Sequence, residues 1–220
     1  MCSFYSKEER KTSIASLTLA VMLKVPGAIE VKSRLAESIG IEQAIIAYRL
    51  MVETFLAQLP VGSVREIYYT PAQAEGKIKS WLGGQYTYYC QAEGDLGNRL
   101  STACEESLGR GAEAVVLMGG DCPYINQSVI EEVAEGLNRK DIVIGPTLDG
   151  GYYLIACKQL IPDLFKSINW STDSVFLETL ERIKTLGLTV FILNPLEDVD
   201  DLASWQRAEV YINDEVGPEN

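Results

Sequence analysis

Short apolar strands alternate with segments of helical length along almost the whole chain. Strands are expected at 17–23, 67–69, 86–90, 114–118, 142–144, 152–156 and 188–193, and helices at 42–59, 72–82, 95–108, 128–137 and 174–185. A helix between two strands lets the chain cross over the sheet and pair the second strand parallel to the first. The sequence therefore predicts an α/β fold with three layers, α/β/α, around a mainly parallel sheet.

The 220 residues contain no Pro/Ser-rich linker, charge block or internal repeat that would divide them. We expect one domain over residues 16–212, with a flexible N-terminus over 1–15 and a C-terminal tail over 213–220. The longest apolar runs, such as Leu19–Leu23, fall far short of the roughly 20 residues that cross a bilayer, and no cleavable signal pattern opens the chain. A cytoplasmic protein without a membrane span is expected.

The chain has no histidine. This excludes a Ser-His-Asp triad and removes the commonest ligand of soft metals. Catalysis must then use carboxylates, hydroxyls, Lys and Arg or a metal, and carboxylate ligands favour Mg²⁺ or Mn²⁺ over zinc or copper. The five cysteines are scattered and form no Cys-x-x-Cys pair, so neither a zinc site nor a disulfide framework is indicated.

The net charge of −12 is distributed unevenly. Residues 1–35 carry six Lys and Arg against three Glu, so the excess of acidic residues lies in the remainder of the chain. An acidic protein repels DNA and RNA, and nucleic acid is therefore not an expected partner. A local basic cluster can still hold one small phosphate group.

Three basic residues, Lys24, Lys32 and Arg34, lie in or just after the first predicted loop between strand and helix. Cations and backbone amides in such a loop can converge on a phosphate. The alternative is three solvated surface charges. The glycine fingerprints of dinucleotide-binding and P-loop proteins are both absent.

Two aspartates follow buried strands or lie in a glycine turn. Asp121 comes just after strand 114–118, and ligands of open α/β sheets bind beyond the carboxyl ends of strands. Asp149 begins an Asp-Gly-Gly turn. Each also has a structural explanation, because aspartate caps helices and Asp-Gly is a strong hairpin signal.

Three more polar clusters follow strands or precede helices. They are Gln91–Arg99 around Asp95, Trp170-Ser171-Thr172, and Asp198 with Asp200. Their aspartates and hydroxyls can serve as helix N-caps, and the last pair can instead form a metal-binding edge. Because all five polar clusters fall beyond strand ends, we expect them to line one crevice.

These motifs occur in a fixed order over about residues 17–205, and together they resemble the GT-A-like rSAM/selenodomain-associated transferases. That family is related to nucleotide-diphospho-sugar transferases and to phospholactate and molybdenum-cofactor nucleotidyltransferases. The resemblance is carried by Lys24-Val25-Pro26 through Lys32-Ser33-Arg34-Leu35, Gly94-Asp95-Leu96-Gly97-x-Arg99, Gly120-Asp121-x-Pro123, Gly145-Pro146-x-x-Asp149-Gly150-Gly151-Tyr152-Tyr153, Trp170-Ser171-Thr172 and Asp198-Val199-Asp200. The chain departs from the family where Ala28-Ile29 replaces Pro-Gly and where Asp201 replaces the Thr after Asp-x-Asp.

The resemblance implies a Rossmann-like GT-A fold that binds a nucleotide diphosphate through Mg²⁺ or Mn²⁺. It implies catalytic roles for Asp121 and Asp149 and metal ligation by Asp121, Asp198 and Asp200. The implied nucleotide- and phosphate-binding residues are Lys24, Pro26, Lys32, Ser33, Arg34, Asp95 and Arg99, and the implied substrate-binding residues are Gly150, Gly151, Tyr152, Trp170, Ser171 and Thr172.

The function expected from the sequence is metal-dependent transfer of a group from a nucleotide-diphosphate-activated donor to a small-molecule acceptor. The leading expectation for the donor is a nucleotide-diphosphate sugar, which makes the protein a glycosyltransferase. One alternative is a nucleotidylyltransferase that combines an NTP with a phosphorylated acceptor and releases pyrophosphate. The other is a nucleotide-binding protein without catalysis.

Overall fold

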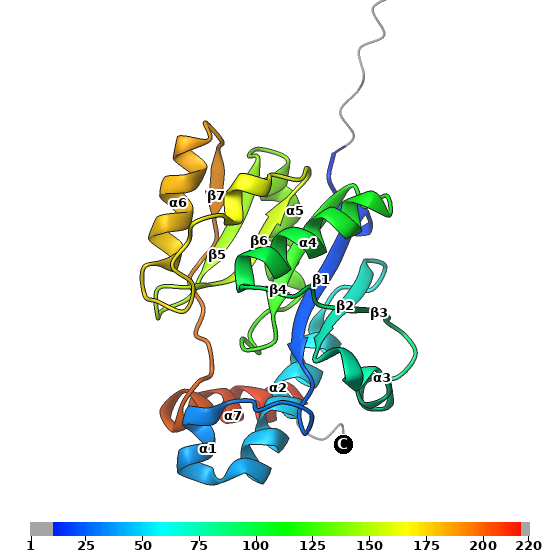
Figure 1. The fold of residues 1–220 in the computed structure, drawn as a ribbon, viewed down its shortest axis with the longest axis vertical. Helices are drawn as coiled ribbons and strands as arrows, with labels where there is room; N and C mark the ends of the chain where they lie inside the picture. The colour runs from blue at the N-terminus through cyan, green and yellow to red at the C-terminus, as the bar shows by residue number, and fades with distance from the viewer. Residues whose placement is uncertain (1–10, 217–220) are drawn as a thin grey trace, which may run out of the picture.

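A seven-stranded sheet runs through the centre of the molecule in the order β3-β2-β1-β4-β6-β5-β7 (Figure 1). The structure is a computed structural model that describes residues 11–216. The strands are β1 (Leu17–Lys24), β2 (Val64–Thr70), β3 (Thr87–Cys90), β4 (Ala114–Gly119), β5 (Ile142–Pro146), β6 (Tyr152–Cys157) and β7 (Val190–Ile192). Only β6 runs antiparallel to its neighbours, β4 and β5, in this sheet. The predicted mainly parallel sheet is confirmed.

The antiparallel β6 follows from the short connection that precedes it. Only five residues, 147–151, separate β5 from β6, which is too short for a crossover and suits a hairpin. Gly150 has φ +94°, a conformation that glycine adopts without strain. The Asp-Gly signal is thus a genuine turn, and it places the first residue of β6 at the edge where the parallel strands end.

Helices cover both faces of the sheet, as the three-layer prediction requires (Figure 1). They are α1 (Ser33–Ile39), α2 (Ile41–Gln58), α3 (Glu75–Leu82), α4 (Leu96–Gly109), α5 (Gln127–Leu137), α6 (Val175–Thr185) and α7 (Leu202–Val216), with 3-10 turns at Ile14–Ser16, Ala72–Ala74 and Pro162–Phe165. Buried side chains of α1, α2, α3, α5 and α7 pack on one face, and those of α4 and α6 pack on the other. Strand β1 is buried on both faces, which explains its continuous apolar sequence.

Helix α1 was not predicted, because residues 33–39 were read as part of the first loop. Its seven residues bury only Leu35, so they carry almost no helical periodicity. Helix α7 continues to Val216, past the expected start of the C-terminal tail at residue 213. Within the expected N-terminal segment, Thr12 exchanges two backbone hydrogen bonds with the Asn138 side chain, while residues 1–10 lie outside the described part of the chain.

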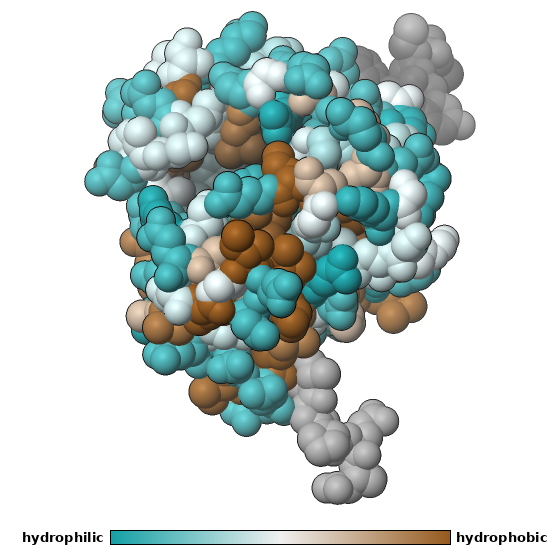
Figure 2. Space-filling model, turned by 60° about the horizontal axis from the view of Figure 1, so that its bottom comes forward, coloured by the Kyte–Doolittle hydropathy of each residue, from teal (hydrophilic) through white to brown (hydrophobic). Residues whose placement is uncertain are grey.

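The surface of the end that carries α1, α2 and α7 is partly hydrophobic. Figure 2 turns this end toward the viewer and shows apolar side chains gathered on it. Ile41 and Ile46 of α2 and Val210 of α7 are exposed.

Within residues 11–216, no helix combines the length and the apolar character that a membrane crossing requires.

Candidate functional site

A cleft of about 870 Å³ lies at the edge of the sheet where the parallel strands end. Its walls include Lys24 at the end of β1, Thr70 at the end of β2, Gln91 after β3 and Asp121 after β4. The chain passes from β1 outward to β2 and β3 and then returns to the other side of β1 with β4. Such a reversal of strand order is the usual ligand-binding position in open α/β sheets.

Most residues predicted for the site line this one cleft, although they come from distant parts of the sequence. The predicted residues in the lining are Lys24, Lys32, Ser33, Arg34, Arg99, Asp121, Asp149, Gly151, Tyr152, Trp170, Ser171, Thr172, Asp198 and Asp200. The prediction that the polar clusters share one crevice therefore agrees with the geometry.

Three predicted site residues do not line the cleft. Pro26 forms an isolated β-bridge with Ile29 and shapes the first loop. Asp95 is the N-cap of α4 and accepts a hydrogen bond from the Asn98 amide at 2.8 Å, so its capping explanation is the one that the structure supports. Gly150 is not part of the lining, and its carbonyl accepts a hydrogen bond from the Phe176 amide.

The cleft contains both cations and carboxylates. Lys24 ends β1 and Arg34 lies on α1, while Arg99 of α4 donates to Gln91 after β3; Asp121 follows β4 and Asp149 lies in the turn between β5 and β6. Within the described chain, no carboxylate lies within ion-pairing distance of those three cations. Their positive charge is therefore available to a bound anion.

Lys32 is the exception among the cations of the cleft. Its side chain is only 3% exposed, and its Nζ lies 2.6 Å from Asp121 Oδ1 and 3.0 Å from Asp200 Oδ1. Burial alone lowers the pKa of Lys32, but the charges of Asp121 and Asp200 outweigh this effect and raise the pKa above its ordinary value. The predicted phosphate ligand is thus paired with two predicted metal ligands.

The backbone brings the last aspartate pair to Asp121. The Val199 amide donates a hydrogen bond to the Asp121 carbonyl at 2.9 Å, and the Val199 side chain is fully buried. Asp198 and Asp200 therefore flank this contact on either side. The capping role at the start of α7 belongs to Asp201, whose Oδ1 accepts the Ser204 amide at 2.8 Å.

Asp198 has the most perturbed carboxyl group of the cluster. Its Oδ1 is buried and accepts no hydrogen bond from any described residue. Desolvation, reinforced by the charge of Asp121, raises the pKa of Asp198 to about 8. An unpartnered buried oxygen is costly unless a ligand satisfies it.

The three aspartates fit a hard cation in donor type but not in their present arrangement. Among residues 11–216 there is no group of three or more His, Cys, Asp and Glu side chains positioned to hold a metal ion. The ammonium of Lys32 lies against the carboxylates of Asp121 and Asp200 instead. Carboxylate oxygens, including the free Oδ1 of Asp198, are nevertheless the ligands that Mg²⁺ and Mn²⁺ prefer.

Asp149 combines a turn role with a place in the cleft. Its Oδ1 accepts hydrogen bonds from the Thr147 hydroxyl and the Gly151 amide, which close the turn. A side chain on Gly150 would meet the Asp173 carbonyl at 2.1 Å, and the Gly150 carbonyl accepts the Phe176 amide at 2.8 Å. The turn is therefore docked on the loop that leads into α6, and Asp149 faces the cleft beside that loop.

The loop before α6 supplies the aromatic part of the wall. Tyr152 and Trp170 meet edge to face with ring centroids 6.3 Å apart. Ser171 has φ +65° and Lys32 has φ +51°, both rare for residues with a side chain. Strained backbone of this kind concentrates at ligand sites, and both residues line the cleft.

Two further residues of the lining are informative: Gln91, which belongs to the polar cluster predicted after strand 86–90 but has no predicted role of its own, and Tyr48, which the sequence did not indicate. The Gln91 Nε2 donates to the carbonyls of Leu23 and Tyr68, and its Oε1 accepts from Arg99. Its position directly after strand 86–90 was the available signal. Tyr48, whose hydroxyl accepts the Lys24 amide at 3.2 Å, gave none because it lies on the apolar face of α2.

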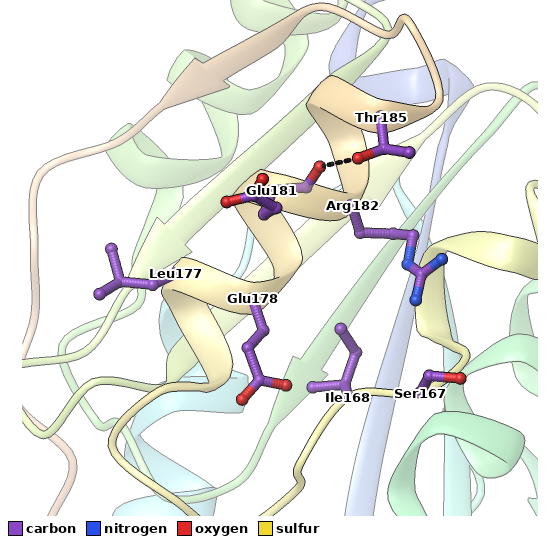
Figure 3. Close-up of a pocket in the computed structure, with 7 residues that line it drawn as sticks. All are labelled: Ser167, Ile168, Leu177, Glu178, Glu181, Arg182 and Thr185. Carbon is purple, nitrogen blue, oxygen red and sulfur yellow. Dashed lines mark hydrogen bonds between the residues drawn. The ribbon is translucent and has the colours of Figure 1, made fainter.

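A second hollow of about 420 Å³ lies along α6, away from the strand ends (Figure 3). Two of its charged side chains already have partners, since Glu178 accepts bonds from Asn169 and Ser174 and Arg182 donates to the Lys166 carbonyl. It contains none of the predicted site residues. The cleft at the strand ends is therefore the candidate site.

Comparison with known proteins places the chain in a family. Residues 56–172 match the family model described as "Uncharacterized protein conserved in bacteria (DUF2064)". The chain belongs to DUF2064. The matched segment contains Arg99, Asp121, Asp149 and Trp170, so the DUF2064 match covers much of the cleft. No curated protein is matched by the sequence.

Solved structures share the DUF2064 chain's fold. A proposed nucleotide-diphospho-sugar transferase from Desulfovibrio desulfuricans G20 is 29% identical, with a TM-score of 0.80 over 91% of this chain and 98% of that one. CMP:2-keto-3-deoxy-manno-octonic acid synthetase complexed with CTP is 12% identical, with a TM-score of 0.57 over 90% and 99%. Rv0371C of Mycobacterium tuberculosis H37Rv in complex with manganese is 14% identical, with a TM-score of 0.53 over 87% and 96%. The predicted Rossmann-like GT-A fold is confirmed.

Proposed function

We propose that this DUF2064 protein is a metal-dependent transferase that takes a nucleotide-diphosphate-activated donor, in the first place a nucleotide sugar, into the strand-end cleft. The observation that carries the proposal is the combination of charges in the cleft. Lys24, Arg34 and Arg99, which form no ion pair within the described chain, line the same cleft as a cluster of aspartates at the point where the strand order reverses. A diphosphate with a bound divalent ion matches both halves of this pattern.

The structural neighbours support a nucleotide ligand. The D. desulfuricans neighbour is a proposed nucleotide-diphospho-sugar transferase, and the synthetase structure contains CTP. The M. tuberculosis neighbour contains manganese. The sequence motifs resemble those of the rSAM/selenodomain-associated transferases, and we therefore propose that the chain belongs to that branch.

Each part of the cleft has a proposed task. Lys24, Arg34 and Arg99 neutralise the phosphates of the donor, and Asp149 orients the acceptor or the donor. Asp121, Asp198 and Asp200 hold Mg²⁺ or Mn²⁺. When bound, the ion stabilises negative charge on the leaving diphosphate, which typically contributes several kcal/mol. Tyr152, Trp170, Ser171 and Thr172 form the substrate-binding wall.

A second candidate is nucleotidylyl transfer from an NTP to a phosphorylated acceptor. Three cations that form no ion pair with a carboxylate among residues 11–216 suit the larger negative charge of a triphosphate or of two phosphorylated ligands. Pyrophosphate is then released from the NTP, whereas sugar transfer releases a nucleoside diphosphate. The released product separates the two reactions.

A thermal-shift panel of nucleoside diphosphates, nucleotide sugars and NTPs, each with Mn²⁺ or with EDTA, tests the proposal. A ligand of the folded state at about 100 times its Kd adds roughly 2.7 kcal/mol to stability, which raises the melting temperature measurably. We expect a shift with at least one nucleotide diphosphate compound and Mn²⁺. No shift with any member of the panel would refute nucleotide binding, and binding without turnover of any donor would indicate the non-catalytic alternative.

A further inference from the structure

Lys32 differs from the other cations of the cleft in both burial and partners. Lys24 and Arg34 are exposed and Arg99 is half-buried, and none of the three forms an ion pair with a carboxylate of the described chain. Lys32 is buried at the start of α1 with its ammonium against Asp121 and Asp200. Its left-handed backbone, φ +51° and ψ +49°, aims the side chain at this cluster.

The ammonium uses the same oxygens that a divalent cation needs. It lies within 3.0 Å of Oδ1 of both Asp121 and Asp200. An ion ligated by these oxygens at roughly 2.0–2.6 Å would stand only a few ångströms from Nζ, where two positive charges repel each other strongly. The ammonium and the metal therefore compete for the carboxylates of Asp121 and Asp200.

The neighbourhood offers the ammonium one other kind of partner. Lys32 lines the same cleft as Lys24 and Arg34, which form no ion pair within the described chain, so an anion drawn to those two enters the cleft that also contains the Lys32 ammonium. A diphosphate can accept the Lys32 ammonium and leave the carboxylates free.

We propose that Lys32 has a guarding role at the acidic cluster of Asp121 and Asp200. Its ammonium stays paired with these two carboxylates until an incoming diphosphate binds the ammonium instead. The metal binds tightly only after this exchange. This inference rests on the proposed function, since it assigns the diphosphate and the metal to the same cleft. It makes the binding of the two ligands cooperative. Because such coupling is reciprocal, each ligand raises the affinity for the other by the same factor.

The test is the binding of Mn²⁺ alone, measured by the electron paramagnetic resonance signal of the free ion. Lys32→Met removes the ammonium but keeps an unbranched side chain, so it adds no new backbone strain. Without nucleotide, Lys32→Met is expected to bind Mn²⁺ about tenfold more tightly than the wild type, which corresponds to the loss of one charged competitor. Lys32→Arg keeps the charge and is expected to bind Mn²⁺ as weakly as the wild type.

Lys24→Met is the matched control, because Lys24 lines the same cleft but contacts no carboxylate among the described residues. This control separates two effects on Mn²⁺ affinity: competition of the Lys32 ammonium for the carboxylates, and the general effect of removing one positive charge from the cleft. Lys32→Gln is measured in parallel as a second variant that keeps a hydrogen-bond donor beside Asp121, in case Lys32→Met does not fold. Circular dichroism checks that each variant is folded. Unchanged Mn²⁺ affinity in folded Lys32→Met or Lys32→Gln would overturn the guarding role, as would an equal gain in Lys24→Met.

The wild-type nucleotide panel keeps this result separate from the proposed function. If the wild type binds nucleotide with Mn²⁺ and the Lys32 variants gain no Mn²⁺ affinity, the guarding role alone is wrong. If the Lys32 variants bind Mn²⁺ more tightly and no nucleotide binds the wild type, the competition stands and the choice of a nucleotide is wrong.

Discussion

Asp198, Asp200 and Asp201 have different environments, although they lie within four consecutive residues of one short loop. Asp201 caps α7, and the Ser204 amide that it accepts lowers its pKa. Asp200 pairs with Lys32 at 3.0 Å, and Asp198 holds a buried oxygen that has no hydrogen-bond partner among the described residues. The sequence predicted that this cluster either binds metal or caps a helix. The sequence could not show which aspartate has which role. The roles depend on the backbone hydrogen bond from Val199 to Asp121, and Asp121 is distant in sequence.

Asp198 should make the stability of the metal-free protein depend on pH. Its folded-state pKa of about 8 lies above the ordinary value of 3.8, so the folded protein retains a proton that the unfolded chain releases. Between these two values the free energy of unfolding falls as pH rises, by up to about 1.4 kcal/mol per pH unit. Asp198→Asn removes this dependence.

Urea unfolding in EDTA at about pH 5 and about pH 8 measures the effect. We expect Asp198→Asn to gain stability relative to the wild type as the pH rises. Asp173→Asn, in which an exposed aspartate of the same cleft is replaced, serves as the reference. A constant difference between Asp198→Asn and the wild type would contradict the burial argument.

Asp121→Asn should separate ligand binding from folding. The asparagine keeps the shape of the side chain, and the backbone bond to Val199 does not involve the carboxylate. Asp121 is about half exposed (49%), and Asp200 still pairs with the buried Lys32 ammonium at 3.0 Å, so the ammonium keeps a carboxylate partner and the fold should persist. Metal-dependent nucleotide binding should be lost because a hard cation needs the negative charge.

Calorimetry with Mn²⁺ and nucleotide, together with a melting curve in EDTA, checks both halves of the Asp121 prediction. Asp201→Asn is the matched variant, since asparagine caps a helix about as well as aspartate and Asp201 faces α7. It should keep both properties. Normal Mn²⁺-dependent binding by Asp121→Asn would remove Asp121 from the metal site.

Elements with a strong pattern were predicted well, and the exceptions have identifiable physical reasons. Strands β1 and β4 appear where apolar runs occur, because burial on both faces leaves a continuous signal in the sequence. Helix α1 leaves little signal, because seven residues with one buried side chain cannot show a period of 3.6. The hairpin of β5 and β6 was indicated by Asp149-Gly150, but its docking against the loop before α6 was not.

That docking predicts a large effect for Gly150→Ala. The added methyl would meet the Asp173 carbonyl at 2.1 Å, and the residue would also have to keep φ +94°. Strain of this kind costs on the order of 1–3 kcal/mol, and a backbone clash adds to it. The melting temperature should fall by several degrees, and the loop that carries Trp170 should become accessible to protease.

Gly62→Ala is the control for the Gly150 prediction, because Gly62 has φ +98° and open space around its α-carbon. It shares the conformational strain but not the clash. The two variants should therefore differ in melting temperature by the effect of the clash alone. Equal losses would show that the contact with Asp173 contributes nothing.

At the scale of the whole molecule, the sheet order decides which charges meet. The sequence indicated which residues follow strands, but it could not show that β6 inserts between β4 and β5 or that β1 and β4 are neighbours. Those pairings depend on contacts between residues far apart in the chain, and they place Lys32 between Asp121 and Asp200. Lys32 was therefore predicted to contact phosphate, whereas the structure pairs it with carboxylates.

The overall charge adds a last expectation, that nucleotide affinity depends on a divalent ion. A protein of net charge −12 with five aspartates in its cleft repels an anionic ligand unless a cation offsets that charge locally. Lys24, Arg34 and Arg99 provide part of this compensation, and Lys32 is already paired. Mn²⁺ should therefore raise the affinity for a nucleoside diphosphate by a factor within the range of about 5 to 150 that is typical of coupled sites.

Calorimetric titration of the wild type with each nucleoside diphosphate, in Mn²⁺ and in EDTA, measures this coupling. Repeating it with Ca²⁺ distinguishes a site that needs a small ion at short distances from one that needs only positive charge, because Ca²⁺ prefers longer bonds and more ligands. A smaller gain with Ca²⁺ than with Mn²⁺ fits ligation by the aspartates. Equal affinity in Mn²⁺ and EDTA would mean that the cations of the cleft suffice and that Asp121, Asp198 and Asp200 serve Lys32 rather than a metal.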